Sequence, residues 1–195
     1  MIKTAITGNI ASGKSQVEKI LLSLGFKVID SDKINHELLT KNKEVIKEIK
    51  SAFGSEIFNS SGEIIKQKLA DIIFTSIEKK QILESILHKR IIKTINNFFE
   101  ENQKEKIIFA SVPLLFEAKW ENNFDKIIFV SAPYNERLKR LIKRNNLSEE
   151  QAKQRINAQQ SEEEKIKKSD FVIYNNSDFV SLNKSVINIL SNLSF

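Results

Sequence analysis

Eight residues near the N-terminus have the types and the spacing of a phosphate-binding loop. Residues 8–15, Gly-Asn-Ile-Ala-Ser-Gly-Lys-Ser, match the pattern G-x-x-x-x-G-K-[ST] in full. Gly8 and Gly13 allow tight turns, so that successive backbone N–H groups point inward and form a nest for an anion. In this pattern the Lys14 ammonium binds the β- and γ-phosphates, and the Ser15 hydroxyl is a ligand of Mg²⁺. The phosphate loop therefore predicts a nucleoside triphosphate site.

Two carboxylates follow the next apolar segment of the chain. Asp30 and Asp32 come after the short β-branched run at residues 26–29. Because ligand groups of a parallel sheet lie beyond the carboxyl ends of its strands, we expect both carboxylates in the crevice of the phosphate loop. A kinase needs a carboxylate beside the γ-phosphate to accept the proton of a hydroxyl substrate. In the alternative interpretation Asp30 caps the helix that follows, since Asp is a preferred N-cap residue.

Basic residues crowd a helix that we expect at residues 134–145. Arg137, Arg140 and Arg144 are spaced i, i+3, i+7, which places them on one helix face. They suit a lid over the nucleotide, because the guanidinium fork binds phosphate oxygens in two-point fashion. A solvated helix surface explains the same charges, and the sequence leaves both interpretations open.

Two classes of phosphate-loop protein are disfavoured. A GTPase needs an Asp three residues before a glycine and an Asn-Lys-x-Asp guanine motif, and the sequence has neither. Motor and transport ATPases end an apolar strand with an acidic residue. Here the apolar run at 106–111 ends at a serine that Val-Pro follows, and the run at 126–130 is followed by Ser-Ala-Pro. Neither run ends with an acidic residue. The carboxylates after residues 26–29 favour a small-molecule kinase instead.

Composition is that of an ordinary globular protein. The chain has 195 residues, of which 41% are hydrophobic and 29% charged, and it has no cysteine, which excludes disulfides and thiolate chemistry. No apolar run approaches the roughly 20 residues of a membrane span, and no signal peptide precedes the first strand, so we expect a cytoplasmic protein. The net charge is +6, but the basic stretch 137–155 has no aromatic residue for stacking on bases. We therefore expect neither nucleic acid nor a membrane as partner.

The elements that must position these groups alternate between strands and helices. Apolar β-branched runs predict strands at residues 2–7, 26–29, 106–111, 126–130 and 171–174. Helical spacing and end signals predict helices at 14–24, 76–102 and 134–145, a short one from Leu114, one from a capping box at Ser148 to Gln160, another from Ser161, and a last one that buries residues from Leu182 to Leu193. The expected fold is α/β, a three-layer phosphate-loop NTPase fold with a five-stranded parallel sheet.

Residues 33–103 form a long block without a convincing strand. The block is longer than a plain crossover between two strands needs, so we expect a helical insertion that carries substrate contacts. The predicted organisation is a single kinase domain over 1–195, with the insertion at about 33–103 and an arginine-rich lid at about 134–160.

In its order of motifs the chain resembles the dephospho-CoA kinase family over nearly its whole length. Besides the phosphate loop, the resemblance rests on residues 24–32, Leu-Gly-Phe-Lys-Val-Ile-Asp-Ser-Asp, and on residues 112–117, Val-Pro-Leu-Leu-Phe-Glu. The lid at 140–159 and the closing strand at 169–175 also resemble that family. The acidic pair and residues 112–117 are far more specific than the phosphate loop.

The resemblance implies phosphoryl transfer from ATP to the ribose 3′-hydroxyl of dephospho-CoA, the last step of coenzyme A synthesis. It implies catalytic roles for Lys14, Asp32 and Arg140, Mg²⁺ at Ser15 and Asp30, and an acceptor held by Asp32, His88 and Glu117. Expected ATP contacts are Asn9, Ile10, Ala11, Ser12, Gly13, Lys14, Ser15, Arg144 and Asn175. A monomer is favoured over a homo-oligomer.

Several alternatives stay open beside the resemblance. Asn9 and Ala11 stand where the family usually has glycine, and Lys89 replaces the proline that usually follows His88. His88 could simply pack on its helix or face water, and Glu117 could be a surface carboxylate. The alternative function is another phosphate-loop kinase, acting on a small metabolite or a nucleoside monophosphate.

Overall fold

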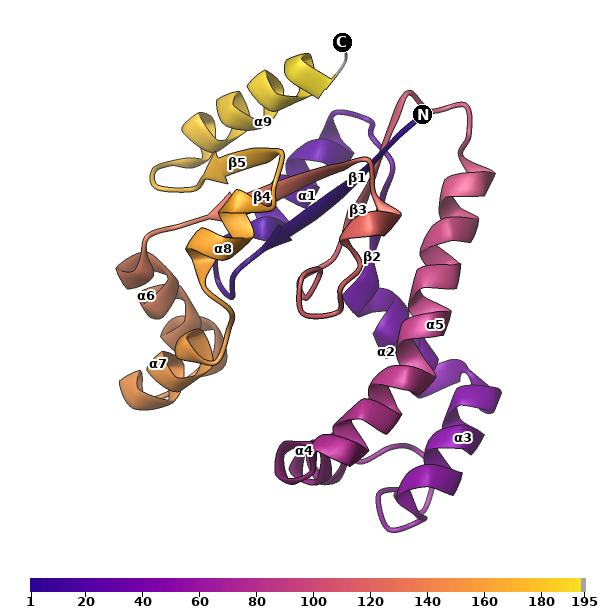
Figure 1. Cartoon of the computed structure of the whole chain (residues 1–195). Coiled ribbons are helices and arrows are strands. Elements are labelled where there is room, and N and C mark those ends of the chain that lie inside the picture. The colour runs from indigo at the N-terminus through magenta and orange to yellow at the C-terminus, as the bar shows by residue number, and fades with distance from the viewer. Residues whose placement is uncertain (194–195) are drawn as a thin grey trace. The chain divides into compact units, whose positions relative to one another are not determined.

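The structure is a computed structural model and describes residues 1–193 (Figure 1). Its contacts divide the chain into two compact units. One unit is formed by residues 1–30 together with the chain from Phe99 onward, and the other by residues 31–98. The first unit contains the sheet, and the second is helical.

The sheet of the first unit has five parallel strands, as the sequence predicts. The strand order is β2-β3-β1-β4-β5, so the strand that leads into the phosphate loop lies in the centre. The strands are β1 (Ile2–Gly8), β2 (Val28–Asp30), β3 (Ile107–Ser111), β4 (Lys126–Ser131) and β5 (Phe171–Tyr174). Together with its helices the sheet makes the expected three-layer α/β fold.

The central strands are buried on both faces, which explains why they are continuous apolar runs rather than alternating ones. On one face, helices α1 (Lys14–Ser23) and α9 (Phe179–Leu193) cover the core. These two helices also pack on each other, as Figure 1 shows beside β5. The core residues they share with the sheet include Ile6, Val17, Ile128, Leu182 and Val186.

The second strand starts two residues later than the sequence predicts. Gly25 has a left-handed φ of 87°, and it donates to Leu22 O while Phe26 N donates to Leu21 O at 3.0 Å. This pair of bonds is a Schellman motif that closes α1. Because the N–H of Phe26 is used to end the helix, the strand ladder begins only at Val28.

The basic segment forms three helices. Helix α6 (Tyr134–Asn145) has the predicted bounds, and α7 (Glu149–Asn157) opens with the predicted capping box of Ser148 and Gln151. Helix α7 ends at Asn157 rather than at Gln160, because the chain turns there and the Gln159 side chain reaches Ile10 N. Helix α8 (Glu162–Lys167) follows Ser161 as expected.

The prediction of a short helix from Leu114 is wrong. The chain makes a run of turns there, and a 3-10 helix η1 (Glu121–Asn123) comes only afterwards. A single helix-like bond joins Ala118 N to Leu114 O, but Lys119 adopts a left-handed φ of 56° and Trp120 N returns to Leu115 O. The left-handed residue stops the helix before it can propagate.

The second unit, residues 31–98, is built from helices. Its helices are α2 (Ser31–Lys41), α3 (Lys43–Phe53), α4 (Lys66–Thr75) and most of α5 (Ile77–Glu101). Arg90 of α5 pairs with Glu48 of α3 at 2.5 Å, and the Lys79 ammonium donates to Ala52 O at the end of α3. Among residues 1–193 no helix, α5 included, is long and apolar enough to cross a membrane.

Candidate active site

The phosphate loop joins β1 to α1 and has the conformation of an anion nest. Ala11 and Gly13 both have left-handed φ angles, 61° and 97°, and Ser12 between them donates its N–H to Asn9 O at 3.0 Å. Alternation of left- and right-handed residues turns successive N–H groups toward one side. The positive end of α1, which begins at Lys14, adds to the same anion site.

Both glycines of the loop are required by close neighbours. A Cβ on Gly8 would lie 2.5 Å from Val130 O, and a Cβ on Gly13 would overlap the Asn175 side-chain amide. The sequence motif accounts for these glycines by the geometry of the loop. The structure adds a second reason, because Gly8 packs against β4 and Gly13 packs against the residue after β5. The Asn175 amide is buried and donates to Ser12 O at 2.8 Å.

Lys14 is held on the side of the loop by two residues that the sequence analysis missed. Its ammonium pairs with Glu18 Oε1 at 2.8 Å and bonds to the Ser111 hydroxyl, which itself donates to Glu18 Oε1 at 2.6 Å. Ser111 ends β3, where other phosphate-loop ATPases have an acidic residue. In this chain the carboxylate beside Lys14 therefore comes from α1. Glu18 gives a weak sequence signal, because an i,i+4 Lys–Glu pair is common on helix surfaces.

The expected metal ligands lie at the same end of the sheet. Ser15 is in the first turn of α1, and Asp30 is the last residue of β2, where it pairs in register with Ser111. A hydroxyl and a carboxylate are oxygen donors of the kind that Mg²⁺ prefers. Within residues 1–193 no group of three or more acidic or histidine side chains is arranged to hold a metal ion. This donor set fits Mg²⁺ bound mainly through nucleotide phosphates and water.

The three arginines expected on one face of α6 have different surroundings. Arg137 is buried and pairs with Glu162 at 3.2 Å. Arg140 lies over the phosphate loop, with Nη1 3.5 Å from the carbonyls of Ala11 and Ser12. Arg144 bonds to its neighbour Asn145 at an exposed position. The face is therefore neither wholly a solvated surface nor wholly a lid, and only Arg140 contacts the loop.

The hairpin of α6 and α7 packs on the phosphate loop through apolar side chains. Leu141, Ala152 and Ile156 form a small core of their own, against which Ile10 and Ala11 of the loop pack. This packing explains why positions 10 and 11 carry side chains here. The Ile10 N–H also donates to Gln159 Oε1 at 2.7 Å. Residues from the lid region thus hold the loop from outside the motif.

Glu117 is mostly buried in the first unit and forms an ion pair with Lys165. The distance from Lys165 Nζ to Glu117 Oε1 is 2.6 Å, and the Lys165 side chain is 1% exposed. An ordinary surface carboxylate would not have such a partner. Lys165 was missed by the sequence analysis, because a lysine on a short polar helix normally faces water.

Asp32 and His88 belong to the helical unit. Asp32 lies in the first turn of α2, and His88 lies on α5. Partial burial lowers the pKa of His88 below its ordinary value of 6.5, and the nearby Glu84 carboxylate opposes this shift. The imidazole is therefore neutral at pH 7, so it can both donate and accept a hydrogen bond.

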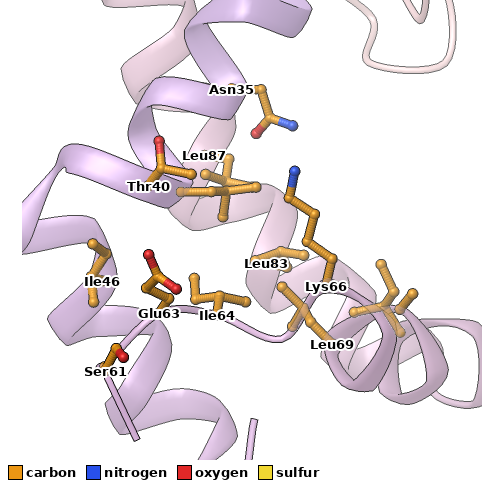
Figure 2. Close-up of a pocket in the computed structure, with 14 residues that line it drawn as sticks. Asn35, Thr40, Ile46, Ser61, Glu63, Ile64, Lys66, Leu69, Leu83 and Leu87 are labelled. Carbon is orange, nitrogen blue, oxygen red and sulfur yellow. The ribbon is translucent and has the colours of Figure 1, made fainter. Parts of the chain in front are cut away.

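The helical unit also contains a cavity of about 620 Å³ (Figure 2). One side is apolar, with Leu69, Leu83 and Leu87 among its walls. Figure 2 shows the Lys66 side chain extending toward Asn35, while Thr40 and Glu63 lie elsewhere on the cavity wall. A cavity of this size and lining suits a small molecule with a long uncharged part.

Comparisons with known proteins agree with this geometry. The family model for dephospho-CoA kinase matches residues 2–181. A curated dephospho-CoA kinase from Fusobacterium nucleatum is 43% identical over 184 residues, which cover 93% of each chain. The solved structure of a protein from Thermus thermophilus has a TM-score of 0.84 and 33% identity, covering 100% of this chain and 98% of that one. A solved dephospho-CoA kinase from Campylobacter jejuni gives 0.73 and 34%, with 98% and 96% covered. This protein belongs to the dephospho-CoA kinase family.

Proposed function

We propose that this protein transfers the γ-phosphoryl group of ATP to the ribose 3′-hydroxyl of 3′-dephospho-CoA, giving CoA and ADP. The observation that carries the proposal is a complete phosphate loop, in an anion-binding conformation, in a chain that belongs to the dephospho-CoA kinase family. The main alternative, a kinase of another small metabolite, would use the same loop with a different acceptor.

The nucleotide half of the reaction is assigned to the first unit. The loop N–H groups and the start of α1 would bind the β- and γ-phosphates, with the Lys14 ammonium moving from Glu18 toward the γ-phosphate. The Arg140 guanidinium would bind phosphate oxygens, as its place over the loop suggests. Arg144 and Asn175 would contact ATP more peripherally, Asn175 by supporting the loop.

Mg²⁺ fits the oxygen donors at this end of the sheet. Ser15 and Asp30 would hold it, and when bound it neutralises negative charge on the phosphates. The carboxylate of Glu18 lies one helical turn from Ser15 and adds negative charge to the same region. Once Lys14 has moved to the γ-phosphate, this charge would favour a cation there.

The acceptor half of the reaction is assigned to the helical unit. Asp32 would accept or orient the 3′-hydroxyl proton, which is the task that phosphoryl transfer leaves to a carboxylate. His88, neutral at pH 7, would offer a hydrogen bond to the acceptor rather than a charge. The mostly apolar cavity beside α4 and α5 is the proposed place for the uncharged arm of dephospho-CoA. Glu117 remains a proposed acceptor contact.

The test measures ADP release from Mg-ATP with dephospho-CoA as acceptor, and in parallel with nucleoside monophosphates, adenosine and shikimate. Turnover confined to dephospho-CoA, with the new phosphate located on the 3′-oxygen by NMR, is the expected result. Turnover with another acceptor and none with dephospho-CoA would replace the proposal by the alternative. An Asp32→Asn protein that binds Mg-ADP normally but does not turn over would assign the carboxylate.

We further propose that the enzyme is cytoplasmic and monomeric. Gln159, Arg140 and Asn175 contact the phosphate loop from within the same chain, which supports a monomer. Light scattering after size exclusion should give a mass near the 22.4 kDa of one chain. A stable dimer would contradict this part of the proposal without affecting the reaction.

A further inference from the structure

Lys165 is a fully buried lysine that the proposed reaction does not use. Its ammonium donates to Asn9 Oδ1 at 3.0 Å and to Glu117 Oε1 at 2.6 Å. The side chain is 1% exposed, so the charge depends on these partners for its stability. One partner is the second residue of the phosphate loop, and the other lies in the turns that follow β3. A single buried cation therefore joins the phosphate loop to the turns that follow β3.

The Asn9 amide uses both of its ends in this arrangement. Its oxygen faces the Lys165 ammonium, and its nitrogen donates to Glu162 Oε2 at 3.4 Å. The opposite amide orientation would place the NH₂ group against a cation and the oxygen against a carboxylate, so the charges fix the side chain. Glu162 is itself held by the Ser131 hydroxyl at 2.5 Å and by Arg137.

The buried charges balance one another. Lys165 and Arg137 supply two positive charges, and Glu117 and Glu162 supply two negative ones. The Glu117 and Glu162 side chains are each 25% exposed, so water has limited access to the network. Each cation of this network faces a carboxylate, and this pairing restricts the movement of the side chains that join it.

The same short segment supports the next residue of the loop. Gln159 accepts the Ile10 N–H at 2.7 Å, so residues 159–165 contact both Asn9 and Ile10. We call residues 159–165 the loop support. The loop support contacts residues near the start of the phosphate loop, Asn9 and Ile10. The N–H groups from Ala11 to Ser15 form the nest for phosphate.

We propose that Lys165 is a positioning residue for the nucleotide, acting through Asn9. By fixing the Asn9 side chain and the turns after β3, it keeps the phosphate loop in its binding conformation before the nucleotide arrives. Preorganisation of this kind lowers the cost of binding. The inference rests on the proposed nucleotide site but not on the identity of the acceptor.

The test measures binding of Mg-ADP by calorimetry in Lys165→Met, which keeps the length of the side chain and removes its charge. We expect affinity to fall by about tenfold to a hundredfold, the size that a small misplacement of binding groups can produce. Lys167→Met is the matched control, because Lys167 is exposed on the same helix and should bind Mg-ADP like the wild type.

A second variant separates positioning from stability. Lys165→Met leaves the Glu117 carboxylate without its cation, and Glu117→Gln in the same chain removes that unpaired charge. The double variant should regain much of the thermal stability but should still bind Mg-ADP weakly. If affinity returns together with stability, the role of Lys165 is merely structural and the proposal is wrong.

Asn9→Ala keeps the Lys165–Glu117 ion pair and tests the path through the loop, even where Lys165→Met does not fold. It should weaken Mg-ADP binding with little loss of melting temperature, and wild-type affinity would overturn the proposal. Failure of the proposed function would look different. The wild type would then bind Mg-ADP but leave dephospho-CoA unphosphorylated, and the binding measurements on the variants would keep their meaning.

Discussion

Asn175 and Gly13 approach so closely that no side chain fits between them. Asn175 follows β5, and its amide occupies the position that a Cβ on Gly13 would take, while it donates to Ser12 O at 2.8 Å. The phosphate loop is thus closed by a residue more than 160 positions later in the chain. The motif glycine is required by this contact as well as by its left-handed φ of 97°.

Gly13→Ala should therefore destabilise the protein more than an alanine at another left-handed glycine. Gly25→Ala is the matched control, since φ there is 87° and no atom lies within 4 Å of the place that a Cβ would take. The control should lose about 1–3 kcal/mol of unfolding free energy from backbone strain, and Gly13→Ala should lose more. Chemical denaturation measures both. Adding Asn175→Ala to Gly13→Ala should recover part of the loss, and no recovery would mean that the contact is unimportant.

Lys14→Met should lower kcat strongly while the protein stays folded. The Lys14 ammonium is the group that would neutralise charge on the transferring phosphoryl group, so its loss should reduce turnover by about a hundredfold or more. Lys19→Met, at an exposed position of α1, should behave like the wild type. A coupled assay of ADP release gives both rates, and similar rates for the two variants would rule out this role for Lys14.

Asp32→Asn should reduce kcat by about 10²- to 10⁴-fold, the usual contribution of a positioned acid or base. Asp32 is exposed in the first turn of α2, so the protein should stay folded after the substitution. Binding of Mg-ADP should stay within twofold of the wild type. Unchanged turnover would remove Asp32 from the mechanism.

Arg140→Lys should lower kcat more than Arg144→Lys does. Arg140 lies over the loop carbonyls, whereas Arg144 is bonded to its exposed neighbour Asn145. Lysine keeps the charge but loses the planar fork that binds two phosphate oxygens at once. Steady-state rates at saturating ATP compare the two variants. Equal effects would contradict a special role for Arg140.

His88 should make stability depend on pH. Burial lowers its pKa in the folded protein below the 6.5 of the unfolded chain, so the unfolded state binds more protons as the pH falls. The stabilising contribution of neutral His88 is therefore complete above pH 6.5 and is lost as the pH falls toward the folded pKa. His88→Gln should flatten the melting temperature between pH 7 and pH 5, and His36→Gln is the control. An unchanged slope in His88→Gln would contradict the expectation.

Most of the fold could be predicted because its signals are local. The strand β1, the phosphate loop and helix α1 are specified by consecutive residues, and α6 has the predicted bounds because its apolar spacing is regular. Two of the differences in the sheet unit arise from end effects. Phe26 closes a helix instead of opening a strand, and Lys119 turns left-handed where a helix was expected.

The supporting residues of the site could not be predicted, because their burial depends on distant partners. Lys165 and Asn9 are 156 positions apart, and nothing in the neighbourhood of either residue indicates the other. Arg137 is predicted on the same helix face as Arg140. It is nevertheless buried, because it pairs with Glu162 on the later helix α8. A charged residue at a polar helix position predicts exposure, and only the tertiary fold reverses that expectation.

The central place of β1 in the sheet has a consequence for synthesis of the protein. This strand is synthesised well before both of its neighbours, since β3 and β4 begin only at residues 107 and 126. Contacts between segments so far apart in sequence form slowly, because a long loop must close before they are made. The phosphate loop, moreover, is completed by residues 159–175. A nascent chain should therefore gain its affinity for nucleotide only when residues 159–175 have emerged, and ATP would then act as a late ligand that stabilises the fold.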